Sequence, residues 1–416
     1  MQTQLAPEYQ NTLIGQEAEA ILRQCVHCGF CAATCPTYQL MGDELDGPRG
    51  RIYLIKQIAE GQLPTEKTRG HLDRCLTCRN CESTCPSGVE YGKLVDIGRK
   101  WAEEKTAPRP SAERITRWLL KEGLTSPTLF NTAMTMGRLM RPLMPETLKR
   151  KVPQGLPAGE RPQRHHTRKM LILEGCVQPG MLPNINNATI RVFDALRIEL
   201  ISSNKAGCCG ALRYHLNDQN GGLADAKRNI DAWWPSIENG KDSVEAIVMN
   251  ASGCGVMVKD YGHLLHDDPL YASKAKRVSE LCKDLSEIMP QFQEQLVQKI
   301  GRDKKAGVVY HPPCTLQHGQ QIRGKVEGLL ESLGIGVNLC ADSHLCCGSA
   351  GTYSVLQPIL SEQLRQQKIQ NLETACASSG AKTVVSGNVG CISHLHQDHL
   401  PVRHWVEIID QLLHKP

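Results

Sequence analysis

The sequence predicts an α+β protein of several domains, in which a mostly helical N-terminal domain precedes two copies of one α/β domain. Two tight cysteine runs lie near the N-terminus, a cysteine-free segment follows, and a pattern of four cysteines then occurs twice. The length of 416 residues exceeds one ordinary domain core. The expected boundaries are 1–104 for the N-terminal domain, 105–167 for a helical linker rich in proline, methionine and arginine, and 168–290 and 303–416 for the two copies.

The two N-terminal cysteine runs, at 25–36 and 75–86, share the spacing C-x2-C-x2-C-x3-C-P. Bacterial two-cluster ferredoxins hold two [4Fe–4S] clusters with this spacing, and the fourth cysteine of each run ligates the cluster of the other run. Two residues between thiolates let the backbone wrap one corner of a cluster, and the proline turns the last sulfur away. The predicted ligands are Cys25, Cys28, Cys31 and Cys85 for cluster 1, and Cys75, Cys78, Cys81 and Cys35 for cluster 2.

These cysteines are expected to be reduced. Residues 1–20 have no basic start and no unbroken apolar stretch, so no secretory signal peptide is predicted, and a chain that stays in the cytoplasm keeps its thiols free. Structural zinc is the alternative, but zinc takes only four ligands and gives no reason for the third cysteine two residues on or for Cys-Pro twice. The segment of about 40 residues between the runs has helical spacing, which a compact β-hairpin ferredoxin would not need.

The C-terminal part is an internal duplication, because four cysteines recur 138, 138, 138 and 137 residues later. Each copy alternates short β runs with helices, which predicts a parallel sheet covered on both faces. The carboxyl ends of such strands form the ligand crevice, and every repeated cysteine follows one of these ends. The candidate metal or redox residues are Cys176, Cys208, Cys209 and Cys254 in the first copy, and Cys314, Cys346, Cys347 and Cys391 in the second. The β runs are expected at 169–173, 198–202, 244–249, 307–310, 336–339 and 382–385.

Plainer interpretations of these residues stay open. The repeated cysteines could be small apolar fillers of a duplicated core, although two adjacent side chains at a strand end rarely both pack inward. Cys282, Cys340 and Cys376 have no counterpart in the repeat and are expected to be ordinary core cysteines. His311 precedes Cys314 by three residues, where it could tune a cluster, donate a proton to a quinone, or hydrogen-bond a loop.

Composition excludes several classes of function. The formal charge of +5 comes without a basic platform interleaved with aromatic residues, so nucleic-acid binding is not expected. No apolar run approaches the ~18 residues that span a bilayer, so membrane contact is expected to be peripheral at most. No G-x-G-x-x-G follows a predicted strand, which argues against a dinucleotide site. The stretch 129–151 mixes methionine and leucine with arginine and lysine, and is either a cover for the domains, a partner-docking surface or a lipid-facing surface.

Longer strings carry a family resemblance, at residues 25–36, 42–51, 71–75, 231–235, 251–255 and 342–348. On these strings the chain resembles the iron–sulfur subunits of a group that includes glycolate oxidase, anaerobic glycerol-3-phosphate dehydrogenase and heterodisulfide reductase. It is most similar to those of glycolate oxidase. The resemblance covers essentially the whole chain and is weakest across 105–167.

This resemblance implies an oxidoreductase subunit that transfers electrons and does not oxidise the substrate itself. A flavin-containing partner would oxidise glycolate to glyoxylate, with D-lactate as a second substrate, and the clusters would relay the electrons towards quinone. A further subunit is implied too, in a complex on the cytoplasmic face of the inner membrane. Electron transfer for another 2-hydroxy acid or for glycerol-3-phosphate is the alternative within the group.

The chain departs from the heterodisulfide reductases at one position of each copy. Their Cys-Cys-Gly motif ends in Cys-x-x-Cys, and five sulfurs serve an unusual cluster. Here the position of the fifth cysteine holds Met257 in the first copy and His394 in the second. Two expectations therefore stay open. One is direct thiol–disulfide reduction at the Cys-Cys-Gly sites, and the other is a further iron–sulfur cluster in one or both copies. Four thiols suffice for a [4Fe–4S] cluster, and His394 could add a ligand.

Overall fold

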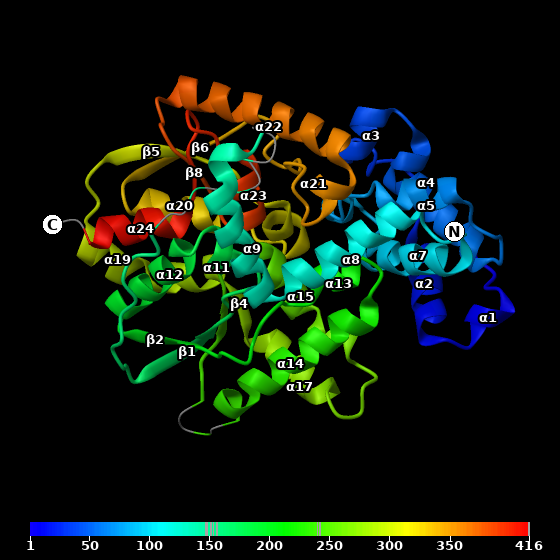
Figure 1. Cartoon of the computed structure of the whole chain (residues 1–416), viewed down its shortest axis with the longest axis horizontal. Helices are drawn as coiled ribbons and strands as arrows, with labels where there is room; N and C mark the ends of the chain where they lie inside the picture. Colours follow the sequence, from blue (N-terminus) through cyan, green and yellow to red (C-terminus); the bar gives the residue numbers. More distant parts are fainter. Residues whose placement is uncertain are drawn as a thin grey trace.

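The computed structural model describes the chain except for residues 146–148, 150, 151, 153, 155, 156, 239, 241, 242, 415 and 416. Figure 1 shows the N-terminal helices at one end of the molecule and the C-terminus at the other. No helix in the described part of the chain combines the length and apolarity needed to cross a membrane.

The N-terminal region is helical, and residues 1–145 contain no strand. At the start of one helix the Thr12 side chain accepts a hydrogen bond from the Gly15 N–H, and a capping box of Thr65 and Thr68 begins another. The apolar faces of these two helices meet in one core, which contains Leu22 of the first helix and Leu72 of the second. The predicted mostly helical domain is therefore confirmed. The helices are α1 (Pro7–Gln10), α2 (Leu13–Gln24), α3 (Pro36–Met41), α4 (Pro48–Ala59), α5 (Glu66–Asp73), α6 (Asn80–Thr84) and α7 (Tyr91–Lys105), with the 3-10 turn η1 (Glu44–Asp46).

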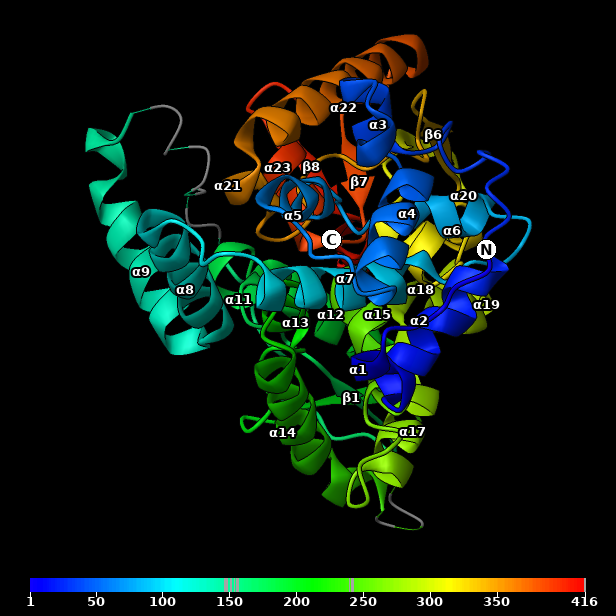
Figure 2. The same ribbon diagram turned by 90° about the vertical axis from the view of Figure 1, so that its right-hand side faces the viewer.

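The linker begins as a pair of helices, α8 (Ser111–Thr125) and α9 (Pro127–Met140). Figure 2 shows this pair on the side of the molecule away from α1 and α2. Phe130 and Met134 are buried, whereas 58% of Trp118 and 78% of Leu139 is exposed. One face of the pair therefore covers the body and the other is open. Arg150 and Lys151, which belong to the expected basic stretch, lie outside the described residues.

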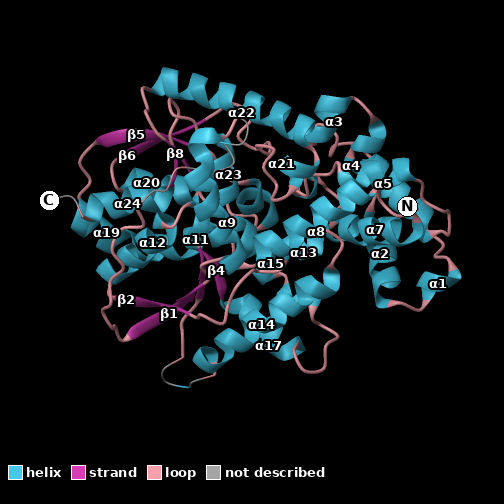
Figure 3. Ribbon diagram, viewed as in Figure 1, coloured by secondary structure: helices cyan, strands magenta, loops and turns pink. Residues whose placement is uncertain are grey.

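Each copy of the repeat contains a four-stranded, fully parallel sheet (Figure 3). In the first copy the order is β2-β1-β3-β4, and in the second it is β6-β5-β7-β8. Three strands of each sheet lie where the sequence predicts them. The strands are β1 (Arg168–Ile172), β2 (Ile198–Ser202), β3 (Ile247–Met249), β4 (Cys282–Asp284), β5 (Lys305–Tyr310), β6 (Ile335–Leu339), β7 (Val384–Ser386) and β8 (Val402–His404).

The edge strands β4 and β8 were not predicted from the sequence. Each is only three residues long and directly precedes a helix that an Asp284 or His404 side chain caps. Both strands contain charged residues in place of the continuous apolar run that marks the equally short β3, so only pairing with β3 and β7 reveals them.

The two copies pack through a shared apolar core. Helix α12 (Asn184–Ala195) of the first copy lies against α24 (Trp405–Leu413) of the second, and Phe193 and Trp405 belong to one buried cluster. Arg191 on α12 binds the Asp410 carboxylate through Nε and Nη2, at 3.0 and 2.7 Å. The two sheets are thereby held in a fixed relation to each other.

The long helices of the repeats lie between the strands, as the predicted alternation requires. Helix α14 (Gln219–Ile237) and its counterpart α22 (Pro358–Ser379) each follow a Cys-Cys-Gly motif, and α20 (Lys325–Ser332) precedes β6. The predicted fold class, a helical domain followed by two repeated α/β domains, is confirmed. The exact boundaries between the domains stay predictions.

Candidate metal centres

The two N-terminal cysteine runs adopt the same local conformation. His27 and Thr77, each just before the second cysteine, have left-handed φ values of 56° and 53°. The residue after that cysteine is left-handed too, as Gly29 in the first run and Arg79 in the second. These paired turns curl the backbone around a common centre, which is what three thiols that hold one cluster require. Arg79 is not a glycine, and its left-handed conformation therefore costs roughly 1–2 kcal/mol.

The runs fold so that two adjoining cavities are lined by cysteines of both. Cys25, Cys28 and Cys31 line the first cavity together with Cys85, the last cysteine of the other run. Cys81 and Tyr91 line both cavities. The structure thus brings each predicted set of four thiols around its own cavity, and their assignment as cluster ligands remains a prediction. The second cavity is lined by Cys35, Cys75, Cys78 and Cys81.

The donor set suits a metal cluster. All nineteen cysteines are free thiols, and burial raises the pKa of Cys31 to about 11 and those of Cys78 and Cys81 well above the ordinary range. Closely packed thiols without cations would thus stay protonated, whereas bound iron deprotonates them and compensates their charge. The residues therefore fit [4Fe–4S] clusters, whose thiolates the two cavities would supply.

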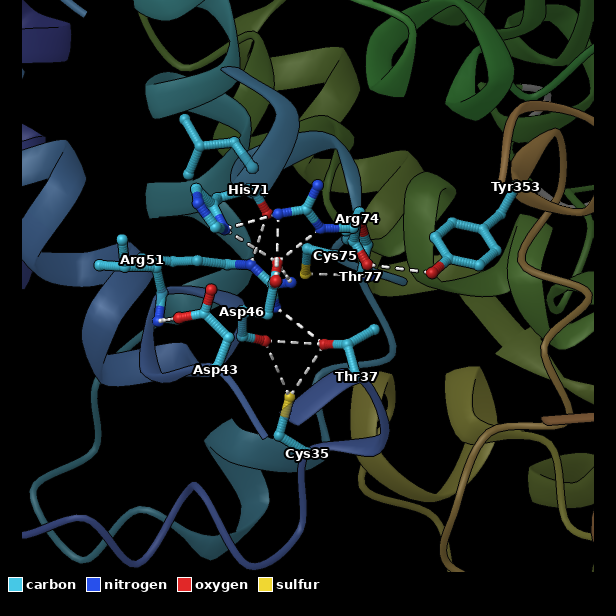
Figure 4. Close-up of polar contacts among 12 residues, drawn as sticks. Cys35, Thr37, Asp43, Asp46, Arg51, His71, Arg74, Cys75, Thr77 and Tyr353 are labelled. Carbon is cyan, nitrogen blue, oxygen red and sulfur yellow. Dashed lines mark hydrogen bonds and ion pairs between the residues drawn. The ribbon is translucent and has the colours of Figure 1, made fainter. Parts of the chain in front are cut away.

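A buried ion network supports the second cavity (Figure 4). Asp46 is fully buried and contacts Arg74 at 2.7 Å, His71 at 3.1 Å and Arg51 at 3.4 Å. Burial alone would raise the pKa of Asp46, but hydrogen bonds from Arg74 and His71 outweigh it, so this pKa is lowered. Asp46 is therefore an anion between cations contributed by α4 and the loop that precedes Cys75.

The same network reaches the thiols. Arg51 donates to Thr37 Oγ1 at 3.1 Å, and Thr37 Oγ1 lies 3.3 Å from the sulfur of Cys35. Tyr91 OH lies 3.6 Å from the sulfur of Cys75. Sequence reasoning singled out the 42–51 string only for its resemblance and did not recognise Asp46 and Arg51 as supports for the cysteine loops, because their partners are far away in sequence.

The repeated cysteines also come together, in two groups of four thiols. In the first copy Cys208 interacts with both Cys176 and Cys209, and Cys209 interacts with Cys254. Asn229 Nδ2 donates to the carbonyl of Cys208 at 2.8 Å and fixes the loop. The expected convergence at the carboxyl ends of the strands is what the structure shows, although a metal or redox role remains a prediction.

In the second copy the thiols form the equivalent series. Cys314 and Cys346 lie 3.8 Å apart, and Cys347 interacts with both Cys346 and Cys391. The ring of His311 also lies here: one ring nitrogen and the sulfurs of Cys347 and Cys391 are all within 4.8 Å of one another. Burial, with a smaller contribution from Lys368, holds the pKa of His311 well below its usual value, so the ring is neutral.

His394, the ligand suggested by the sequence, has different surroundings. Its Nε2 lies 3.5 Å from Ser361 Oγ on α22, and it is not in the group formed by His311, Cys347 and Cys391. Cys282 and Cys340 pack in apolar clusters, as expected of core cysteines.

The thiols of the second copy adjoin the second cysteine run. Cys78 and Cys314 both pack against one apolar cluster that contains Cys346, and after burial the nearby Cys314 is a further cause that raises the pKa of Cys78. Ser83 Oγ and His318 Nδ1 lie 2.7 Å apart across this boundary. Tyr353 OH reaches the carbonyl of Arg74 at 3.1 Å (Figure 4). The first copy instead contacts the N-terminal region through ion pairs, such as Arg79 with Asp260.

Replacement of Asp46 by asparagine should destabilise the N-terminal domain by about 3–5 kcal/mol, because it leaves buried Arg51 and Arg74 without their anion. Since the folded-state pKa of Asp46 is lowered, its contribution is fully present above the unfolded value of about 3.9 and is lost as the pH falls through the folded value, so the difference between variant and wild type should be large at pH 7 and shrink in strong acid. Urea unfolding of anaerobic protein, followed by circular dichroism, measures it. Asp43→Asn, an exposed cap that asparagine replaces well, is the control. Equal stabilities of the two variants would contradict this role.

Known families match the two parts of the chain separately. A family described as "4Fe-4S dicluster domain" matches residues 21–89. A family described as "Cysteine-rich domain" matches twice, at residues 170–259 and 308–396. These matches confirm two [4Fe–4S] clusters as cofactors and confirm the duplication.

Relatives match over long stretches. The "Glycolate oxidase iron-sulfur subunit" of Escherichia coli is 52% identical over 417 aligned residues, which cover 100% of both chains. The "Probable glycolate oxidase iron-sulfur subunit" of Bacillus subtilis is 29% identical and covers 92% of this chain and 90% of its own. "Lactate utilization protein A" of Bacillus subtilis is 26% identical over 55% of this chain and 90% of its own. With paired cysteine cavities, two Cys-Cys-Gly repeats and a full-length relative of this identity, the chain belongs to the glycolate oxidase iron–sulfur subunit family.

Proposed function

We propose that the chain is the electron-transfer subunit of a complex that oxidises glycolate to glyoxylate, with D-lactate as a second substrate. It relays electrons from a flavin-containing partner towards quinone. The observation that carries the proposal is that the two cysteine cavities adjoin and that Cys81 and Tyr91 line both of them. Clusters held in these cavities would be neighbours, close enough to exchange electrons. The names of the relatives from Escherichia coli and Bacillus subtilis, which refer to glycolate and to lactate, support the substrates.

The electron count agrees with this division of labour. Oxidation of a 2-hydroxy acid releases two electrons and two protons, and a flavin accepts the pair. A [4Fe–4S] cluster carries one electron at a time, so two clusters in series pass the pair on singly. Quinone takes up two electrons and two protons to become quinol. Because quinone dissolves in the bilayer, we place the complex on the cytoplasmic face of the inner membrane, where a further subunit completes the path.

The exposed end of the relay is the loop of the first cysteine run. Cys28 is exposed, and the neighbouring Val26 and Phe30 leave 68% and 62% of their surface open. Cluster 2 lies deeper, because Cys75 and Cys81 are buried and Cys78 faces the second copy. We therefore assign this loop as the docking site of the flavin-containing partner and cluster 1 as the entry point for electrons.

The alternative of a thiol–disulfide reductase finds less support. Such an enzyme needs an accessible thiolate, whereas Cys209 and Cys347 are 4% and 1% exposed. The hydrogen bond with Cys208 lowers the pKa of Cys209, but Cys254 and burial outweigh it, so the net pKa lies well above the usual range. Neither adjacent pair presents a nucleophile to a disulfide.

Serine variants test the crossed ligand assignment. We expect Cys85→Ser to perturb the same cluster as Cys28→Ser, and Cys35→Ser the same cluster as Cys78→Ser, each with the loss of up to about four irons. Electron paramagnetic resonance of the reduced, anaerobically purified protein distinguishes the two clusters. If Cys85→Ser instead perturbed the same cluster as Cys78→Ser, the crossed assignment would be wrong.

The iron content of the unaltered chain tests the repeats. About eight irons per chain would mean that the repeats are empty, and twelve to sixteen would mean one or two further clusters.

The relay is tested in the assembled complex. With the flavin-containing partner bound, glycolate should reduce a quinone analogue, and Cys78→Ser should abolish this while a dye that takes electrons from the flavin is still reduced. The isolated chain should reduce neither acceptor with glycolate. Robust glycolate-dependent dye reduction by the isolated chain would refute the proposed division of labour.

The docking site is tested by Phe30→Ser, which should weaken binding of the flavin-containing partner about tenfold or more, the scale of an apolar anchor residue. Iron content should not change, because the Phe30 side chain points to solvent. Leu139→Ser on α9 is the matched control, exposed to 78% on the other candidate surface. Weaker binding by Leu139→Ser together with normal binding by Phe30→Ser would transfer the docking site to the linker.

A further inference from the structure

The second copy contains a buried imidazole that the two-cluster relay does not use. His311 follows β5 directly and is 1% exposed. Neither of its ring nitrogens has a hydrogen-bond partner among the described residues. A buried polar ring without a partner is costly, so the orientation of this ring towards Cys347 and Cys391 requires an explanation.

Hydrogen bonds hold the backbone of His311, and its ring takes no part in them. The His311 N–H donates to the Val385 carbonyl at 2.8 Å, and Ser386 Oγ donates to the His311 carbonyl at 2.8 Å. These two bonds extend the pairing of β5 with β7, and both are made by backbone atoms of His311. The interpretation of His311 as a hydrogen-bond partner of its loop is therefore not supported by the contacts of the ring.

The duplication supplies an internal comparison. The residue 138 positions earlier, also three before the first repeated cysteine, is Leu173, which is buried in an apolar cluster. The fold of the repeat thus accommodates an apolar side chain here and does not itself need an imidazole. The copy that has the imidazole is also the copy whose thiols adjoin Cys78.

From this juxtaposition we infer that His311 is a nitrogen ligand of an iron–sulfur centre in the second copy, together with the thiolates of Cys314, Cys346, Cys347 and Cys391. The inference rests on the proposed electron-transfer function and extends it by one centre. A neutral imidazole Nδ1 or Nε2 is an ordinary ligand for iron. It supplies a fifth donor where the second copy has no fifth cysteine.

The ligand type has a redox consequence. A neutral imidazole leaves less negative charge on iron than a thiolate does, and the exchange of cysteine for histidine raises the reduction potential of an iron–sulfur centre. The oxidised centre then accepts one electron from reduced cluster 2, which is reoxidised in the same step. The second copy becomes the acceptor end of the relay, whereas the first copy, with Leu173, has no such ligand.

The test uses full-length protein labelled with [15N]histidine, purified anaerobically, reduced and examined by pulsed electron paramagnetic resonance. We expect nitrogen hyperfine coupling to a centre distinct from the two N-terminal clusters. His311→Leu, which copies the first repeat, should lose this coupling and up to about four irons. His394→Met, which copies the first repeat at the other histidine, is the matched control and should keep both. His311→Cys should keep the iron, lose the coupling and lower the midpoint potential.

Two results would overturn the inference: coupling that persists in His311→Leu, whether or not His394→Met loses it, or a wild-type chain with about eight irons and no third centre. In the last case intact signals from both N-terminal clusters would leave the proposed function standing. Loss of those signals in the wild-type chain would refute the relay itself. If His311→Leu fails to fold, His311→Cys still decides the question through its coupling and midpoint potential.

Discussion

The exchange of one cysteine between the two N-terminal runs is the constraint on which the rest of the structure depends. Cys35 leaves the first run to line the cavity of the second, and Cys85 makes the opposite crossing. Neither cavity is complete until the intervening helices have brought the second run back to the first. Cluster binding and folding of this domain are therefore coupled, as in other small metal-containing domains.

The intervening helices contribute more than length. Asp46 lies between Arg51 on α4 and Arg74 before the second run, and the backbone of Asp46 accepts a hydrogen bond from Thr37 at 2.9 Å. Asp46 thus joins both cysteine loops and the helix between them, the first loop through its backbone carbonyl and the others through its buried carboxylate. Its cations lie beside thiols that become anionic when iron binds, so the same network that stabilises the fold also offsets the charge of cluster 2.

The duplication produced two copies of one fold with different surroundings. Both copies gather four thiols at the carboxyl ends of a parallel sheet, but only the second lies against Cys78 and carries His311 near its thiols. The first copy meets the N-terminal domain through surface charges such as Asp260. The proposed electron path therefore runs from the exposed Phe30 loop through the two cavities to the second copy. The first copy lies beside this path and shares its core with the second.

The sequence by itself determined the helical N-terminal domain, the two sets of four thiols around the cavities, the duplication and six of the eight strands found among the described residues. These features follow from local spacing, since C-x2-C turns, strand alternation and a period of 138 residues are properties of short segments. Cys208 and Cys254 were expected to meet because the ends of parallel strands share one edge of a sheet.

Tertiary structure alone decided the rest. The short strands β4 and β8 form only by pairing with a neighbour, and the bond between Asp46 and Arg74 joins residues 28 positions apart that no periodicity relates. The sequence offered His394 as a residue that could add a ligand and His311 as one that could tune a cluster, and only the folded chain shows that the ring of His311 lies beside Cys347 and Cys391. Which copy adjoins cluster 2 also depended on packing between domains, because both copies carry the same cysteines and only their contacts differ.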